Sequence, residues 1–119
     1  MGRRVVSITA FRVPVDESDR FLDRWSEIAR IMARQPGMVR ARMHRALADD
    51  EQPPFVAEDG QPRFVTVVEW ESRQALDRAV ATLELRASAQ RMWEDPSLHF
   101  TAHHLVYGVA VELQPEANR

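Results

Sequence analysis

The sequence predicts a single α+β domain with an antiparallel sheet, in which strands and helices follow one another in the order β-α-β-β-α-β. Two segments carry apolar residues at helical spacing, and four others have the alternating or continuous apolar pattern of strands. At 119 residues, with 45% hydrophobic and 29% charged residues, the chain has the size and composition of one globular domain over residues 1–119.

The first half of the chain predicts a strand, a helix and a second strand. Residues 4–13 are rich in β-branched side chains and end before Pro14, which favours a strand. The helix that follows has Asp16 as its expected N-cap and is stopped by Pro36-Gly37. The second strand is expected from about Met38 to Leu47. The apolar stripe of the helix consists of Phe21, Leu22, Trp25, Ile28, Ala29 and Met32.

A loop extension of about 48–62 separates the two halves. It is acidic and proline-rich, which predicts an exposed loop or hairpin extension. The third strand is expected over Arg63–Trp70, and Ser72 is a suitable N-cap for the next helix.

The last part of the chain predicts further helix and a long strand. Helical turns are expected from about Glu84 to Trp93, ending before Asp95-Pro96. The last strand is expected from about Phe100 to Leu113, followed by a polar, flexible tail over 114–119. Together these elements predict a ferredoxin-like fold.

The strand patterns also predict a homodimer. A sheet covered by helices on one side should be polar on the other, but the first, third and last strands are apolar on both faces. An exposed apolar face of this size is unusual in a monomer. Packing the open sheets of two copies face to face would cover it, with the long last strand reaching across the partner.

Composition excludes several kinds of chemistry. There is no cysteine, so disulfides, thiolate catalysis and cysteine-based metal sites are excluded. All 16 basic residues are arginine, so Schiff-base chemistry and a P-loop lysine are excluded too. The net charge of −2 and the lack of a basic stripe argue against nucleic acid as a partner. No apolar run approaches the roughly 20 residues that span a bilayer, and no secretory signal is evident, so we expect no membrane contact and a cytoplasmic location.

The four histidines do not form a metal signature. His44, His99, His103 and His104 include no H-E-x-x-H motif, and the adjacent pair should point to opposite faces of a strand. We therefore expect no metal site. Any of the four could serve as a general base near neutral pH.

Two further sets of residues are candidates for a ligand site. Trp70 ends the third strand with Thr66 on the same face, so it either packs in the core or lines a cavity for a flat aromatic ligand. Arg40, Arg42 and His44 share one face of the second strand. They form either a solvated edge or the polar anchors of a pocket mouth.

The motifs, taken in order, resemble the antibiotic biosynthesis monooxygenase family of dimeric α/β barrels. The resemblance rests on the segments RFLDRWSEIARIMARQPG, MVRARMHRAL and RFVTVVEWES, and it covers about residues 5 to 112. The patterns W-x₉-QPG and V-x-E-W-x-S in this order are typical of the superfamily, whose members include oxygenases, haem degraders, cyclases and proteins with no known reaction.

In the oxygenase members, the resemblance implies oxidation of polycyclic phenols such as anthrones by O₂ without a cofactor. Trp70 matches the tryptophan of that family's pocket. The asparagine that the characterised oxygenases carry four residues earlier is Thr66 here, which has one hydroxyl in place of an amide. The proximal histidine of the haem-degrading branch would fall near Val80, so haem is not expected.

The leading hypothesis is therefore a cofactor-independent monooxygenase acting on an aromatic polyketide-type molecule. A cyclase or isomerase using the same pocket without oxygen is one alternative, because Thr66 replaces the asparagine. A non-catalytic module that binds a metabolite or docks a partner through the 48–62 extension is another. The expected catalytic residues are Trp70, Thr66 and His44, and the expected substrate-binding residues are Arg40, Arg42, Arg86, Tyr107 and His104.

Overall fold

The computed structural model describes residues 3–48, 51 and 63–116, and four strands and three helices lie within these residues. The strands are β1 (Val5–Arg12), β2 (Met38–Arg45), β3 (Phe64–Trp70) and β4 (Thr101–Gly108). The helices are α1 (Ser18–Ala33), preceded by the 3-10 turn η1 (Val15–Glu17), α2 (Arg73–Val80) and α3 (Leu83–Trp93).

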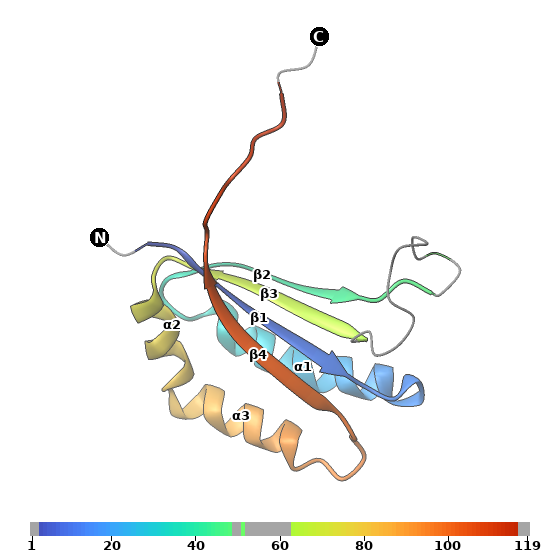
Figure 1. Ribbon diagram of the computed structural model, residues 1–119. Helices are drawn as coiled ribbons and strands as arrows, with labels where there is room; N and C mark the ends of the chain where they lie inside the picture. The colour runs from blue at the N-terminus through green and yellow to red at the C-terminus, as the bar shows by residue number, and fades with distance from the viewer. Residues whose placement is uncertain (1–2, 49–50, 52–62, 117–119) are drawn as a thin grey trace.

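The four strands form one antiparallel sheet in the order β2-β3-β1-β4. The three helices lie on one face of this sheet and leave the other face open (Figure 1). The strand order and the one-sided helical layer confirm the predicted ferredoxin-like α+β fold.

The register of β1, in the middle of the sheet, decides which side chains share a face. Thr9 lies opposite Thr66 of β3 on one side and opposite His104 of β4 on the other. Side chains alternate along each strand, so these three point to the helices, whereas Ile8 and Ala10 point to the open face.

Local sequence signals explain where the helices begin. The side chain of Ser72 accepts a hydrogen bond from the backbone N–H of Ala75 at 3.1 Å, as the sequence predicts for the N-cap of α2. Thr82 caps α3 in the same way, accepting from the N–H of Leu85 at 3.3 Å.

The turn between α1 and β2 depends on glycine. Met38 donates its N–H to the carbonyl oxygen of Gln35, Pro36 follows Gln35, and Gly37 has a φ of +88°. These are the features of a type II turn, in which the third residue must adopt a positive φ. A Cβ on Gly37 would also lie 2.5 Å from the Cβ of Ala75, so both the turn and the approach to α2 require glycine at this position.

The core has two apolar clusters beneath the helices. One is aromatic and contains Phe21 stacked on Phe64, with ring centroids 5.2 Å apart. The other joins Trp70 and Val68 of β3 to the buried face of α2. Members of both clusters also line a cavity between the sheet and the helices.

The last strand is shorter than predicted, because β4 ends at Gly108 rather than at Leu113. Gly108 lies opposite Val5, the first residue of β1, so β4 has no more of β1 to pair with beyond this point. Residues 109–116, which we call the C-terminal arm, are exposed and have no strand partner within the described chain. The arm extends away from the body of the molecule (Figure 1).

Three other predicted boundaries differ or go untested. Asp16 is not the N-cap of the first helix, because it lies within η1 and α1 starts at Ser18 without a side-chain cap. The second strand ends at Arg45, two residues before the predicted Leu47. The predicted 48–62 extension lies outside the described residues except for residues 48 and 51, as do residues 117–119 of the tail.

The open face of the sheet is apolar at its centre. Val6, Ile8 and Ala10 of β1 lie beside Val65 and Val67 of β3 there, and all five remain partly accessible to solvent. Leu105 and Tyr107 continue this face on β4 and are 42% and 46% exposed. No helix among the described residues is both long and apolar enough to cross a membrane.

Candidate active site

A cavity of about 310 Å³ lies between the helices and the covered face of the sheet. This volume is at the lower end of the range for small-molecule sites. The sheet contributes its floor: Thr9, Phe11, Thr66, Val68, Trp70, Ala102 and His104. The helices and the segment before β4 contribute the walls: Trp25, Ile28, Met32, Leu76, Val80, Leu85, Arg86, Ala89, Met92, Trp93 and Phe100.

The apolar floor is crossed by one row of polar side chains. Thr66, Thr9 and His104 occupy directly paired positions on β3, β1 and β4, and all three line the cavity. Paired side chains on adjacent strands are close neighbours, with Cβ atoms about 5 Å apart. A flat aromatic ligand lying on this floor would therefore contact both a threonine hydroxyl and the imidazole of His104.

His104 is oriented by its neighbour in this row. The hydroxyl of Thr9 and Nδ1 of His104 are 2.7 Å apart and share a hydrogen bond. With Nδ1 engaged, Nε2 is the nitrogen left to contact a ligand. When Nδ1–H donates to Thr9, Nε2 carries a lone pair and can accept a proton.

Partial desolvation of the imidazole against the apolar cavity lining lowers the pKa of His104 below its ordinary value of 6.5. The ring is therefore neutral near pH 7, which is the state that a general base needs. It can take up a proton from a bound phenol or an activated C–H group.

Thr66 and Trp70 complete the deeper part of the floor. Thr66 is 4% exposed and lines the cavity, where its hydroxyl can donate to a ligand. Trp70 is 1% exposed, and its Nε1–H points to the hydroxyl of Ser7 at 3.4 Å, a long hydrogen bond. The indole therefore presents apolar surface to the cavity.

Arg86 on α3 is the charged residue in the described cavity lining. Its side chain is exposed and forms no ion pair with any other described residue, unlike Arg24, Arg34 and Arg91. A guanidinium at the rim of an apolar cavity favours a ligand that carries negative charge.

Four of the predicted site residues lie elsewhere. Arg40, Arg42 and His44 of β2 pair with Glu69, Val67 and Val65, whose side chains point to the open face. Arg40 forms an ion pair with Glu69 at 2.9 Å, and His44 Nδ1 lies 3.2 Å from the carbonyl oxygen of Val65.

Tyr107 pairs with Val6 and also points to the open face. The alternation of side chains along β2 and β4 thus separates these four residues from Trp70, and the expected pocket mouth at β2 does not form within one chain. The cavity brings together Trp70, Thr66, Arg86 and His104.

Sequence reasoning missed Thr9 and Ser7 as parts of the site. Both lie on the covered face of β1, where Thr9 orients His104 and Ser7 receives the Trp70 N–H. The alternation of β1 indicates their face, but their partners follow only from the pairing of three strands.

The described residues offer no cluster of three or more histidine, aspartate or glutamate side chains that could hold a metal ion. The position at which the resemblance would put a haem ligand is Val80, which lines the cavity but has no donor atom. The residues at this position therefore do not fit a haem iron.

Comparison with known proteins gives one family match. Residues 4–91 match the family model described as antibiotic biosynthesis monooxygenase. No curated protein sequence matches the chain at a significant level.

Solved structures with the same fold include two enzymes of different kinds. The cofactor-independent oxygenase SnoaB from Streptomyces nogalater is 23% identical, with a TM-score of 0.70 over 97% of this chain and 100% of that chain. The haem degrader MhuD from Mycobacterium tuberculosis is 21% identical, with a TM-score of 0.62 over 92% of this chain and 99% of that chain. At these identities the likeness establishes the fold and leaves the reaction open.

Proposed function

The chain belongs to the antibiotic biosynthesis monooxygenase family, and we propose that it oxidises an aromatic, polyketide-type small molecule with O₂ and without a cofactor. The observation that carries the proposal is the apolar cavity with Trp70 at one end and the row of Thr66, Thr9 and His104 across its floor. SnoaB, a cofactor-independent oxygenase by name, shares this fold.

An anthrone is the simplest substrate for this reaction. The base removes a proton from the substrate, and the resulting anion passes one electron to O₂ to give a substrate radical and superoxide. The two combine to a peroxide, which takes up a proton and loses water to form the quinone carbonyl. One anthrone and one O₂ thus give one quinone and one water, and the substrate supplies every electron.

Each polar group of the cavity has a role in this scheme. Nε2 of His104 accepts the proton, and Thr9 holds the ring through Nδ1. The hydroxyl of Thr66 donates to the phenolate oxygen that forms. The positive charge of Arg86 favours the anion once it has formed, and Trp70 packs against the rings of the substrate.

The test is O₂ uptake by protein treated with a chelator and shown to be metal-free, with anthrone as the substrate. We expect one O₂ consumed per quinone formed, and a large loss of rate in His104→Gln. No uptake above the uncatalysed rate, or uptake that only an added metal or haem restores, would contradict the proposal.

A cyclase or isomerase is the second candidate, favoured by Thr66. One hydroxyl provides one donor where an asparagine amide provides two, and an acid–base ring closure needs no activation of oxygen. This alternative predicts turnover under anaerobic conditions and a product of the same mass as the substrate, or lighter by one water. A strict requirement for O₂ would eliminate it.

We further propose that the working unit is a homodimer. The apolar centre of the open face, from Val6 to Tyr107, has no cover within the described chain, and a second copy would supply one. The exposed Val111 and Leu113 of the C-terminal arm give further apolar surface for such a partner.

A further inference from the structure

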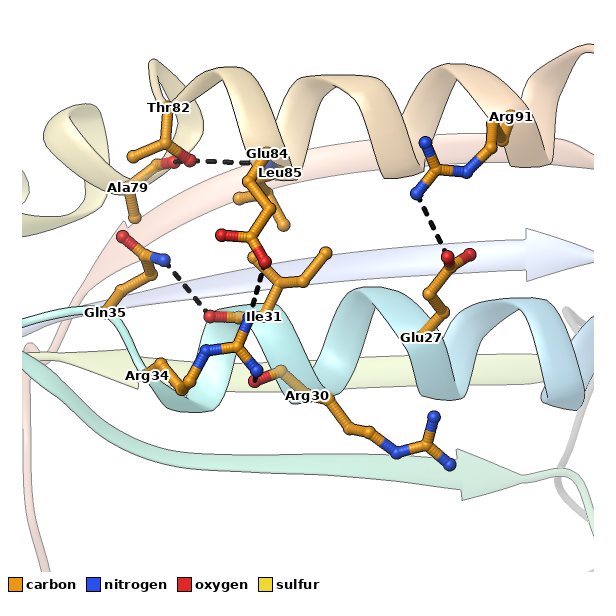
Figure 2. A network of polar contacts seen from close by, with 10 residues as sticks. All are labelled: Glu27, Arg30, Ile31, Arg34, Gln35, Ala79, Thr82, Glu84, Leu85 and Arg91. Carbon is orange, nitrogen blue, oxygen red and sulfur yellow. Dashed lines mark hydrogen bonds and ion pairs between the residues drawn. The ribbon is translucent and has the colours of Figure 1, made fainter.

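One wall of the cavity is joined to α1 by a row of polar contacts. This outer wall consists of α3 and residues 94–100, which carry Arg86, Met92, Trp93 and Phe100 of the cavity lining. The start of η1 and α1 contacts the end of this wall, and the end of α1 contacts the start of α3. In order along η1 and α1, the contacts are Glu17 with His99, Arg20 with the carbonyl of Ser97, Arg24 with Asp95, Glu27 with Arg91, and Arg34 with Glu84. Figure 2 shows the last two of these pairs between the helices.

Glu17 and Asp95 have the least exposed carboxylates of this row, with 9% and 12% of the side chain accessible. The Glu27–Arg91 and Arg34–Glu84 pairs are at the surface, where ion pairs contribute little to stability. One carboxylate oxygen of Glu17 accepts the backbone N–H of His99 at 2.6 Å, and the other contacts His99 Nδ1 at 2.8 Å.

The hydrogen bonds between Glu17 and His99 indicate which of the two side chains carries the proton. The hydrogen bond with His99, aided by its backbone N–H and by the charge of Arg20, lowers the pKa of Glu17 below 4.5. The carboxylate is therefore ionised at neutral pH and can only accept hydrogen bonds, so Nδ1 of His99 must carry the proton. The two bonds fix both the backbone and the side chain of His99.

Phe100 follows His99 directly and is part of the cavity. Its ring centroid lies 4.4 Å from that of Trp93, and it also meets Phe21 edge-on at 5.5 Å. Trp93 lines the cavity but is 57% exposed, which leaves much of a large apolar side chain at the cavity's edge. We call Trp93 and Phe100 the aromatic lip.

We propose that the aromatic lip determines specificity by binding the outer ring of a polycyclic substrate, and that Glu17 and His99 are positioning residues that hold the lip in place. This inference rests on the proposed function, since it assumes that an aromatic molecule enters the cavity. Trp70 pairs with Val5 at one end of β1, whereas the lip lies beyond Ala102, which pairs with Phe11 at the other end. A three-ring molecule that packs against Trp70 therefore reaches further towards the lip than a two-ring molecule does.

Binding of unreactive ligands tests the inference separately from catalysis. The probes are 1-naphthol, with two rings, and 1,8-dihydroxyanthraquinone, with three, each titrated by calorimetry. Wild type should bind the three-ring probe more tightly. Trp93→Ala should weaken that binding on the order of tenfold and leave 1-naphthol binding unchanged.

The positioning residues are tested by variants that differ in one hydrogen bond. Glu17→Gln keeps an acceptor for the His99 backbone but replaces the charged hydrogen bond at Nδ1 with a neutral one, so three-ring binding should weaken by a factor of about three. His99→Ala should do the same, and His99→Asn should restore binding because its amide places an N–H where Nδ1 stood. His99 is 71% exposed at its side chain, so these variants should fold even when Glu17→Gln does not.

Asp77→Asn is the matched control, because it removes one carboxylate from an exposed ion pair with Arg73 on α2. It should bind both probes as wild type does. An equal loss for both probes in Trp93→Ala or His99→Ala, or failure of the wild type to bind either probe, would overturn the inference. Absence of O₂ uptake with selective binding retained would count against the oxidation chemistry alone.

Discussion

His103 and His104 are neighbours in the sequence, but the pleat of β4 turns one ring to the open face and the other into the cavity. Because the pKa of His104 is below 6.5, turnover should be constant near neutral pH and decrease as the pH falls through that lower value. His104→Gln should lower kcat by about 10²–10⁴ and abolish this acid limb.

The pH–rate profile of His103→Gln is the control for this prediction. It loses the same side chain one residue away, and it should keep both the rate and the acid limb of the wild type. An unchanged acid limb in His104→Gln would mean that another group is the base.

Trp70 and Trp93 line the same cavity, but the indole of Trp70 is buried and that of Trp93 is exposed. Trp70 is almost fully buried, so Trp70→Ala should lower the free energy of unfolding by about 3–5 kcal/mol in urea titrations. Trp93→Ala should lower it by only about 1 kcal/mol. Equal losses would contradict the difference in burial between the two indoles. Turnover is best measured with Trp70→Phe, which keeps most of the packing.

At the scale of the elements, the turn between α1 and β2 requires glycine at position 37, and the cost of replacing it can be measured. Gly37→Ala must accept a positive φ and a clash with Ala75 on α2, so it should cost about 2 kcal/mol or more of unfolding free energy. Gly108→Ala, whose Cβ would meet nothing within 4 Å, should be close to neutral. A neutral Gly37→Ala would contradict the turn geometry.

Local signals predicted most of the elements, because each is encoded within its own segment. Ser72 and Pro36-Gly37 indicated the start of α2 and the end of α1, and the apolar stripes indicated the helices themselves. The end of β4 at Gly108 depends instead on where β1 begins, which no local pattern reveals.

The difference between local sequence signals and strand pairing also explains which residues of the site the sequence can predict. The sequence indicates Trp70, Thr66, Arg86 and His104, which the cavity brings together, but it predicts His44 rather than His104 as the catalytic histidine. The alternation along β2 correctly put Arg40, Arg42 and His44 on one face. Whether that face is covered by helices is decided by how β2 pairs with β3, and the partnership of Thr9 with His104 likewise depends on how β1 pairs with β4.

At the scale of the whole molecule, the open face predicts association. Leu105→Asp puts a charge in the apolar centre of this face, on the side of β4 away from the cavity. Light scattering should give a mass of twice 13.7 kDa for the wild type and a shift towards 13.7 kDa for the variant. Leu83→Asp, at an 82% exposed position at the start of α3, should remain a dimer. A well-folded wild-type monomer at micromolar concentration would refute the dimer.

The central claim is that this small cavity oxidises an aromatic substrate with O₂ and with its own side chains alone. Its most direct test is turnover of anthrone by metal-free protein under ¹⁸O₂, followed by mass spectrometry of the quinone. The scheme predicts one ¹⁸O atom in each quinone, with the second atom released as water, and strong dependence of the rate on His104. A quinone without ¹⁸O, or labelling at the same rate in His104→Gln as in the wild type, would contradict it.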